Sequence, residues 1–318
     1  IGSISLDSDD NIWVGTTEGY FIGNPREKDF RKFVPVVGDP DQAWVAPVLN
    51  SSSGAIWIPY WGHGLIRFDP ETDTSEIFEY SPDKEKSISG PIVWAMHENG
   101  DGTIWIGGGD PSGNADNPPF LDLYDPRTKT FEPYITRALP SGIISDLAFD
   151  DQGNIWFIDW NYNLYKLNPT TRELNRFNSG NSMLPAGRLQ SLVKNTDGNI
   201  WIASGDKLVE LNPGKETFST YGSEHGIAPG QYGTDTGILS REGDLIFTRY
   251  VGFHTFNPAE FLKQIKSSEP DIRITGFRLL DENIRTGVTG QGEAVLRFAQ
   301  GRDDALGAGR GLRVVDAL

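Results

Sequence analysis

Short runs of alternating side chains recur along the chain, and each run follows a tight-turn signal. One run reads Asp-Gly-Asn-Ile-Trp-Ile-Ala-Ser and occupies residues 197–204. Gly198 supplies the positive φ that a hairpin turn requires. Side chains alternate between the two faces of a strand, so Ile200 and Ile202 share one face and Trp201 points to the other. The run therefore predicts a tight turn that leads into a β-strand.

Six copies of this run divide the sequence into units of similar length. Five copies carry Trp and the weaker sixth is expected to carry Phe in its place; they centre on Trp13, Trp57, Trp105, Trp156, Trp201 and Phe247. Consecutive centres are 44, 48, 51, 45 and 46 residues apart. Strand-like units with a period of roughly 40–50 residues predict the blades of a β-propeller. We expect the Trp side chains to fill the wedges between blades, where burying one ring stabilises the fold by ~1.5–3 kcal/mol.

A second signal follows each run, namely an Asn-Pro or Asp-Pro pair and then a segment that ends on an aromatic residue. In the second unit, Asp69-Pro70 precedes Phe78. Proline starts a turn but cannot donate to a strand ladder, so the pair belongs between strands. Each unit is therefore expected to have four strands: an innermost strand before the Gly turn, a second with the Trp, a third that ends at the Pro turn, and an outermost that ends at the aromatic.

Composition narrows the range of partners and chemistry. The chain has 318 residues, of which 37% are hydrophobic, so it can bury the core of one large domain. Its 28 basic and 44 acidic residues give a net charge of −16, which makes nucleic acids and anionic membranes poor partners. The chain contains no run of 18 apolar residues, so we expect no membrane span within it. The absence of Cys excludes disulfides and thiolate chemistry, and we expect no cofactor.

The combined pattern resembles the two-component regulator propeller repeat. The resemblance rests on the Gly-Asn-Ile-Trp phrase, the Gly-Leu-x-Arg-Phe-Asp-Pro-x-Thr segment at 64–72, and the Phe-x-x-Tyr ending. The segment at 270–280 is similar to the opening strand of the Tyr-rich (Y_Y_Y) β-sandwich domain that follows such propellers. The fold class expected is all-β: a propeller of four-stranded blades, six visible here and seven implied for the intact ring, followed by part of an Ig-like β-sandwich.

The expected domain boundaries follow from these signals. The propeller takes residues 1–258, a short helical linker 259–269, and the start of the sandwich 270–300, whereas residues 301–318 are left unassigned. Asn257 is expected to cap the linker helix, with Pro258 at its first position. The sequence begins without an initiator Met or a signal peptide, so we expect it to be a piece of a longer protein.

The resemblance also implies a function. Such propellers form the periplasmic sensor region of an inner-membrane receptor, commonly a homodimer whose output module is often a histidine kinase. The segment in hand would then carry no catalysis, and the membrane span would lie outside it. In this family the cue is often a glycan breakdown product, so the expected partner is a carbohydrate or another small ligand.

Candidate ligand-binding residues gather at one end of the expected ring. Loops between second and third strands share this end with the links that join blades, and several carry aromatic and polar residues in place of Gly-Thr. Exposed aromatics with interspersed hydrogen-bonding groups can stack on sugar faces or hold a peptide. The candidates are Trp44, Tyr60, Trp61, His63, Trp94, Asp159, Trp160, Tyr162, His225, Arg249 and Tyr250. The alternative is that these residues pack against a partner domain or a neighbouring blade.

Metal and enzyme interpretations have less support in the sequence. Asp110, Ser112, Asn114 and Asp116 alternate as in a calcium loop, but Ala115 replaces its Gly and the terminal Glu is missing. The four His residues lack metal-ligand spacing, so no metal site is expected. A propeller lyase of the streptogramin-opening type shares the Gly-Asn-Ile-Trp-Phe phrase and remains an alternative, as does a protein-interaction scaffold.

Overall fold

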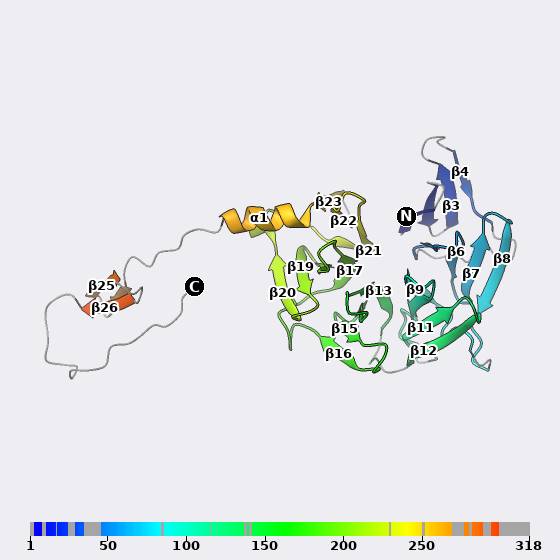
Figure 1. The fold of residues 1–318 in the computed structure, drawn as a ribbon, viewed down its shortest axis with the longest axis horizontal. Coiled ribbons are helices and arrows are strands. Elements are labelled where there is room, and N and C mark those ends of the chain that lie inside the picture. The colour runs from blue at the N-terminus through cyan, green and yellow to red at the C-terminus, as the bar shows by residue number, and fades with distance from the viewer. Residues whose placement is uncertain are drawn as a thin grey trace. The chain divides into compact units, whose positions relative to one another are not determined.

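The computed structural model divides the chain into two units, Ile1–Leu262 and Lys263–Leu318. The described residues are 3–7, 11–16, 18–24, 29–34, 46–83, 86–114, 116–136, 139, 142–228, 230–249 and 252–268, together with the strands 277–279, 282–288 and 294–298. The first unit is a β-propeller whose innermost strands gather at the centre of the ring and whose outermost strands form the rim (Figure 1).

Five blades are four-stranded antiparallel sheets in chain order, and the sixth has three strands. The first three blades contain β1 (Ser3–Leu6), β2 (Ile12–Thr16), β3 (Gly19–Asn24), β4 (Asp29–Lys32); β5 (Leu49–Asn50), β6 (Ile56–Tyr60), β7 (Gly64–Asp69), β8 (Thr74–Glu79); and β9 (Val93–Glu98), β10 (Ile104–Gly108), β11 (Phe120–Asp125), β12 (Thr130–Thr136). The last three contain β13 (Ile144–Phe149), β14 (Ile155–Asp159), β15 (Leu164–Leu167), β16 (Leu174–Phe177); β17 (Leu189–Lys194), β18 (Ile200–Ser204), β19 (Lys207–Asn212), β20 (Thr217–Tyr221); and β21 (Tyr232–Leu239), β22 (Leu245–Arg249), β23 (Phe253–Phe256). The predicted propeller is confirmed.

The repeated Trp residues fill the wedges between blades, as predicted. All five are buried. Trp57, for example, stacks on Phe78 of its own blade at a centroid distance of 5.4 Å and meets Tyr124 of the next blade edge-on at 4.8 Å. A single blade cannot bury both of its faces, so these rings tie each blade to its successor.

The sixth blade departs from the expected pattern by one position. In the fifth blade Trp201 pairs with Val193 of the innermost strand, three residues after the turn Gly. The residue three places after Gly243 is Ile246, whereas Phe247 is one place further along and is fully buried against the other face. The prediction that Phe247 takes the Trp position was therefore wrong, because a strand shifted by one residue presents the opposite face.

Ion pairs link neighbouring blades at the Asx-Pro turns. The turns that begin at Asp69, Asp125, Asn168 and Asn212 each place one non-glycine residue at a positive φ, which is 55° at Lys129 and 54° at Glu216. Lys129 of the third blade reaches Glu76 of the second at 2.9 Å, and Glu216 of the fifth reaches Lys166 of the fourth at 2.8 Å. Arg172 bonds Glu132 across the intervening boundary in the same way. In the third and fourth blades the turn residue is basic and its partner is acidic, whereas in the fifth blade the turn residue is acidic and its partner is basic.

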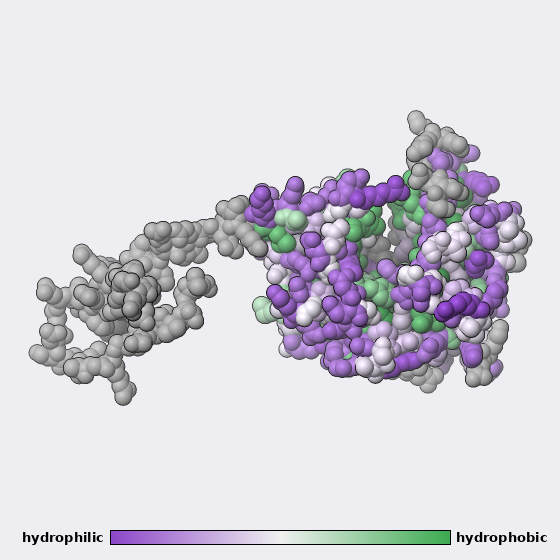
Figure 2. All heavy atoms as spheres, viewed as in Figure 1, coloured by the Kyte–Doolittle hydropathy of each residue, from purple (hydrophilic) through white to green (hydrophobic). Residues whose placement is uncertain are grey.

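Large apolar side chains are exposed on the first and sixth blades. Ile4 and Leu6 lie on one face of β1 and are 62% and 60% exposed. On the sixth blade Ile238 and Phe253 are 57% and 65% exposed. Hydrophobic surface is visible around the hollow at the centre of the ring (Figure 2). The first and sixth blades therefore do not bury these flanks against each other, and a seventh blade in the intact ring stays a prediction.

The linker helix forms as expected, and the second unit contains one small sheet. Helix α1 (Pro258–Ser268) is capped by Asn257, whose Oδ1 accepts a hydrogen bond from the Glu260 amide at 3.3 Å. Phe261 then packs on Tyr221 at a centroid distance of 5.3 Å. The second unit holds an antiparallel sheet of β24 (Phe277–Leu279), β25 (Glu282–Val288) and β26 (Ala294–Phe298). The sandwich stays a prediction, and residues 301–318 lie outside the described residues.

Within the described ranges, no helix combines the length and apolar content that crossing a bilayer requires.

Candidate functional site

Three predicted tryptophans meet at one end of the ring. Trp61 follows β6, Trp94 lies in β9 and Trp160 follows β14, so three successive blades contribute one indole each. The ring centroids of Trp61 and Trp94 are 5.3 Å apart, and those of Trp94 and Trp160 are 5.5 Å apart. All three side chains are half-buried, which leaves part of each ring exposed. We call these three residues the tryptophan track.

Specific contacts hold the track in place. The indole nitrogen of Trp94 donates a hydrogen bond to the Gly109 carbonyl oxygen at 3.0 Å. Edge-to-face packing at 85° between Trp61 and Trp94 follows the preferred geometry of aromatic pairs. The track is thus a preformed, partly exposed aromatic surface on which a flat ligand face can stack.

Arg188 extends the track onto the fifth blade and was not among the predicted residues. It directly precedes β17, and its guanidinium carbon lies 4.6 Å from the ring centre of Trp160. A guanidinium over an indole face is attracted by the ring quadrupole. The signal in the sequence was positional: Arg188 lies immediately before an innermost strand, and such strands begin at the end of the ring where the track lies.

Asp159 has a structural role. Its side chain is fully buried and accepts hydrogen bonds from the amides of Asn161 and Asn163 and from the Tyr165 hydroxyl, at 2.8, 2.9 and 3.0 Å. Burial raises the pKa of this carboxyl group, and the hydrogen bonds oppose that shift. A buried and saturated carboxylate shapes the loop after Trp160 and does not reach a surface ligand, so the ligand-contact prediction for Asp159 is corrected.

The second blade contributes a stacked pair next to the track. Tyr60 is largely buried among core side chains, and His63 stacks on it at a centroid distance of 4.5 Å with a 20° angle between the rings. Tyr162 of the fourth blade is 53% exposed and adopts a φ of 66°. Of these three predicted residues, Tyr60 acts mainly as a support, whereas His63 and Tyr162 retain accessible surface.

A polar cluster lies on the sixth blade. His254 Nδ1 is 2.7 Å from the Tyr232 hydroxyl, and its Nε2 is 3.1 Å from Nη1 of Arg249. Burial and the nearby Arg249 charge both lower the pKa of His254, which favours the neutral imidazole. His225 lies apart from this cluster, in the link after β20, where its Nδ1 accepts a hydrogen bond from the Gly222 amide.

Two predicted residues cannot be placed. Trp44 and Tyr250 lie outside the described residues. In the described part of the chain, no group of three or more His, Asp or Glu side chains is arranged to hold a metal ion.

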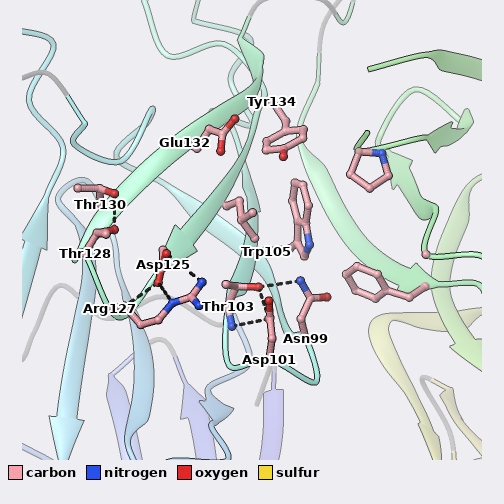
Figure 3. A pocket seen from close by; sticks show the side chains of 14 residues that line it. Asn99, Asp101, Thr103, Trp105, Asp125, Arg127, Thr128, Thr130, Glu132 and Tyr134 are labelled. Atoms are coloured by element: carbon pink, nitrogen blue, oxygen red, sulfur yellow. Dashed lines mark hydrogen bonds and ion pairs between the residues drawn. The ribbon is translucent and has the colours of Figure 1, made fainter. Parts of the chain in front are cut away.

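A separate hollow of about 500 Å³ lies between the third and fourth blades, at the end opposite the track. Figure 3 shows Trp105 and Tyr134 in its wall and the paired Asp125 and Arg127 beside them. The Arg127 guanidinium lowers the pKa of Asp125 by donating hydrogen bonds. Trp105 is 3% exposed and offers little surface. Since Trp105 is buried and Asp125 and Arg127 already pair with each other, this hollow is the weaker candidate.

Comparisons with known proteins place the fold. No protein-family model matches the chain, and no curated protein matches it. The extracellular domain of BT3049 from B. thetaiotaomicron, assigned to a hybrid two-component system, is similar with a TM-score of 0.57 and 15% identity over 94% of this chain. The match covers 46% of that domain, so this chain spans about half its length.

Lyases share the same architecture. A catalytically inactive variant of virginiamycin B lyase from Staphylococcus aureus, solved with quinupristin, gives a TM-score of 0.58 at 12% identity, over 93% of this chain and 90% of the lyase. A streptogramin B lyase structure gives 0.56 at 12% identity, over 93% and 89% of the two chains. At these identities the comparisons establish that the chain is a β-propeller of the architecture found in both receptor domains and lyases.

Proposed function

We propose that this chain is the ligand-recognition region of a bacterial signalling receptor, exposed outside the cytoplasm. The observation that carries the proposal is the tryptophan track, a preformed aromatic surface built by successive blades at one end of the ring. The fold shared with the extracellular domain of a hybrid two-component system supports it. The expected ligand is a carbohydrate or another small molecule with flat apolar faces.

The receptor would then signal because the ligand binds one of its two arrangements more tightly than the other. In a homodimer, a ligand that binds one placement of the propeller more tightly shifts the population toward that placement. The membrane span and the output module, a histidine kinase in the proposed receptor, would lie outside residues 1–318. The propeller itself supplies recognition and no catalysis.

A thermal-shift screen against oligosaccharides tests the proposal. A ligand that binds only the folded chain raises the melting temperature by mass action. Trp94→Ala removes the central ring of the track and should abolish the shift. Phe30→Ala is the control, because Phe30 is an exposed aromatic on β4 of the first blade and is not among the candidate ligand-binding residues. A shift that survives Trp94→Ala, or one lost equally in both variants, would contradict a site at the track.

A lyase is the second candidate, because His254 bonds both Tyr232 and Arg249 on a fold that streptogramin lyases share. Incubating the chain with a cyclic lactone antibiotic and following ring opening by mass spectrometry tests it. Ring opening that His254→Ala abolishes would favour the lyase over the receptor. A protein-interaction scaffold would show neither ring opening nor a saccharide-dependent shift.

A further inference from the structure

Arg188 ends the tryptophan track without a carboxylate partner. Among the described residues, no Asp or Glu lies within ion-pair distance of its guanidinium. A planar guanidinium that stacks on an aromatic ring and lacks a partner is suited to bidentate binding of a carboxylate.

Two hydrogen-bond donors beside each other also lack an acceptor. Nε of Arg188 and the indole nitrogen of Trp160 are buried, and neither has a hydrogen-bond partner in the described part of the chain. A buried donor without an acceptor is costly, and here two such donors accompany a positive charge. The two terminal nitrogens of Arg188 are not buried in this way, so they are the atoms that an anion would meet.

The carboxylates that directly follow or precede residues in contact with Arg188 do not fill this role. Asp206 follows Gly205, whose amide donates to the Arg188 carbonyl oxygen at 3.2 Å, but the Asp206 side chain is exposed and forms no ion pair with Arg188. Asp159 is saturated by its own loop. The net charge of −16 opposes a densely charged polyanion. A ligand with isolated acidic groups is therefore favoured.

We propose that the tryptophan track binds an acidic saccharide. Sugar faces would stack on the exposed parts of Trp61, Trp94 and Trp160, and the carboxylate of one uronic-acid unit would pair with Arg188. This inference depends on one part of the proposed function, namely that the track binds a ligand. It adds that the ligand carries a carboxylate and that Arg188 selects for it.

Titration calorimetry on the full chain, with uronic-acid trimers and their methyl esters, tests the inference. Galacturonate, mannuronate and guluronate trimers are compared with esters of the same sugars, which keep the rings and lose the charge. At least one acid should bind on the order of tenfold more tightly than its ester, since a charge-assisted pair is stronger than a neutral contact. Arg188→Gln should remove this preference. Arg127→Gln is the control, because Arg127 is exposed at the opposite end of the ring.

Each outcome decides the matter. A preference for the acid that disappears in Arg188→Gln and persists in Arg127→Gln supports the inference. Equal binding of acid and ester, or a preference that survives Arg188→Gln, overturns it. Neutral trimers that bind in a Trp94-dependent manner, without any preference for acids, would leave the receptor proposal intact and remove this inference alone. If no uronic-acid trimer binds at millimolar concentration, or if an acidic tripeptide binds in its place, the saccharide assignment fails.

Discussion

A carboxylate six residues before the Trp anchors the indole in two of the blades. In the fourth blade the indole nitrogen of Trp156 donates to Asp150 at 2.9 Å, and the first blade has the same bond. In the fifth blade Asn195 takes the place of the carboxylate. Its Oδ1 accepts hydrogen bonds from two backbone amides, and both its Nδ2 and the Trp201 indole nitrogen are buried without an acceptor among the residues that the structure describes. Two donors thus occupy a place where other blades pair a donor with an acceptor.

Asn195→Asp should therefore stabilise the protein. The carboxylate keeps the two backbone hydrogen bonds and offers a second oxygen to Trp201, as Asp150 does for Trp156. We expect the free energy of unfolding to rise by about 1–3 kcal/mol, which is the usual penalty for an unsatisfied buried donor. Urea unfolding at pH 7 measures it. The reciprocal variant, Asp150→Asn, should lose a similar amount, and a destabilised Asn195→Asp would contradict the mechanism.

Asp122 makes stability depend on pH. It is fully buried in β11 and accepts hydrogen bonds from the amide and hydroxyl of Ser89, both at 2.7 Å. Burial raises the pKa of Asp122 to about 7, and the Ser89 hydrogen bonds only partly offset this. The folded state therefore holds a proton that the unfolded chain, with an Asp pKa near 3.9, releases. The stabilisation that comes from protonated Asp122 is therefore fully present below about pH 4 and is lost as the pH rises toward 7.

Asp122→Asn tests this dependence with little change in shape. The amide can accept from the Ser89 amide and donate to its hydroxyl, so both contacts survive without a charge. We expect the variant to be more stable than wild type at pH 8, by an amount on the order of 1–4 kcal/mol, and similar at pH 4. Thermal unfolding at several pH values should show a flatter profile for the variant. An unchanged slope between pH 4 and 8 would contradict the prediction.

The sequence predicted part of the site at the residue scale. Trp61 and Trp160 could be found because they replace the small residues expected after the second strand, and Trp94 because it begins an innermost strand. Asp159 could not be distinguished from a ligand contact, since only the folded loop shows that its oxygens are saturated. Arg188 escaped notice because it lies in a link of variable sequence, where no repeat consensus makes a departure visible.

At the element scale, neighbouring blades are linked by the residue with positive φ in three of the Asx-Pro turns, namely Lys129, Arg172 and Glu216. Lys166 on β15 meets Glu216 at 2.8 Å, and its side chain is 19% exposed. Glu216→Lys places two cations together and should lower stability by about 0.5–1 kcal/mol, because partly exposed pairs are weak. Adding Lys166→Glu should restore most of the loss. Urea unfolding of the single and double variants gives the coupling energy, and no recovery in the double variant would exclude a direct pair.

Strand count and order were predictable from the sequence, but contacts between blades were only partly so. The Gly turn and the Asx-Pro turn each mark a strand boundary by local chemistry, which is why five blades match in all four strands. The sixth blade has three, and α1 begins at Pro258, the proline of the last Asn-Pro pair. The sequence analysis matched Phe247 to the repeated Trp because both are large and aromatic. The position of a residue along the strand decides which face its side chain occupies, and by that criterion Ile246 is the residue equivalent to the Trp.

At the scale of the whole ring, the exposed flanks determine solution behaviour. Ile238 and Phe253 share one face of the sixth blade, since their partners Ile246 and Thr248 are two residues apart on β22. Large apolar side chains exposed on one face can form an interaction site. We therefore expect residues 1–318, when produced alone, to self-associate as their concentration rises. Sedimentation equilibrium should give an average mass that increases above that of one chain.

The double variant Ile238→Thr and Phe253→Ser should shift this association toward the monomer. Both side chains are more than half exposed, so the free energy of unfolding should change by no more than about 0.5 kcal/mol, as for other surface substitutions. Met183→Ser is the control, because Met183 is 77% exposed in the link before β17, away from the open flank. If the control reduces association as much as the double variant, general surface hydrophobicity is the cause. If the wild-type chain stays monomeric at every concentration, the flank does not adhere to its own copies.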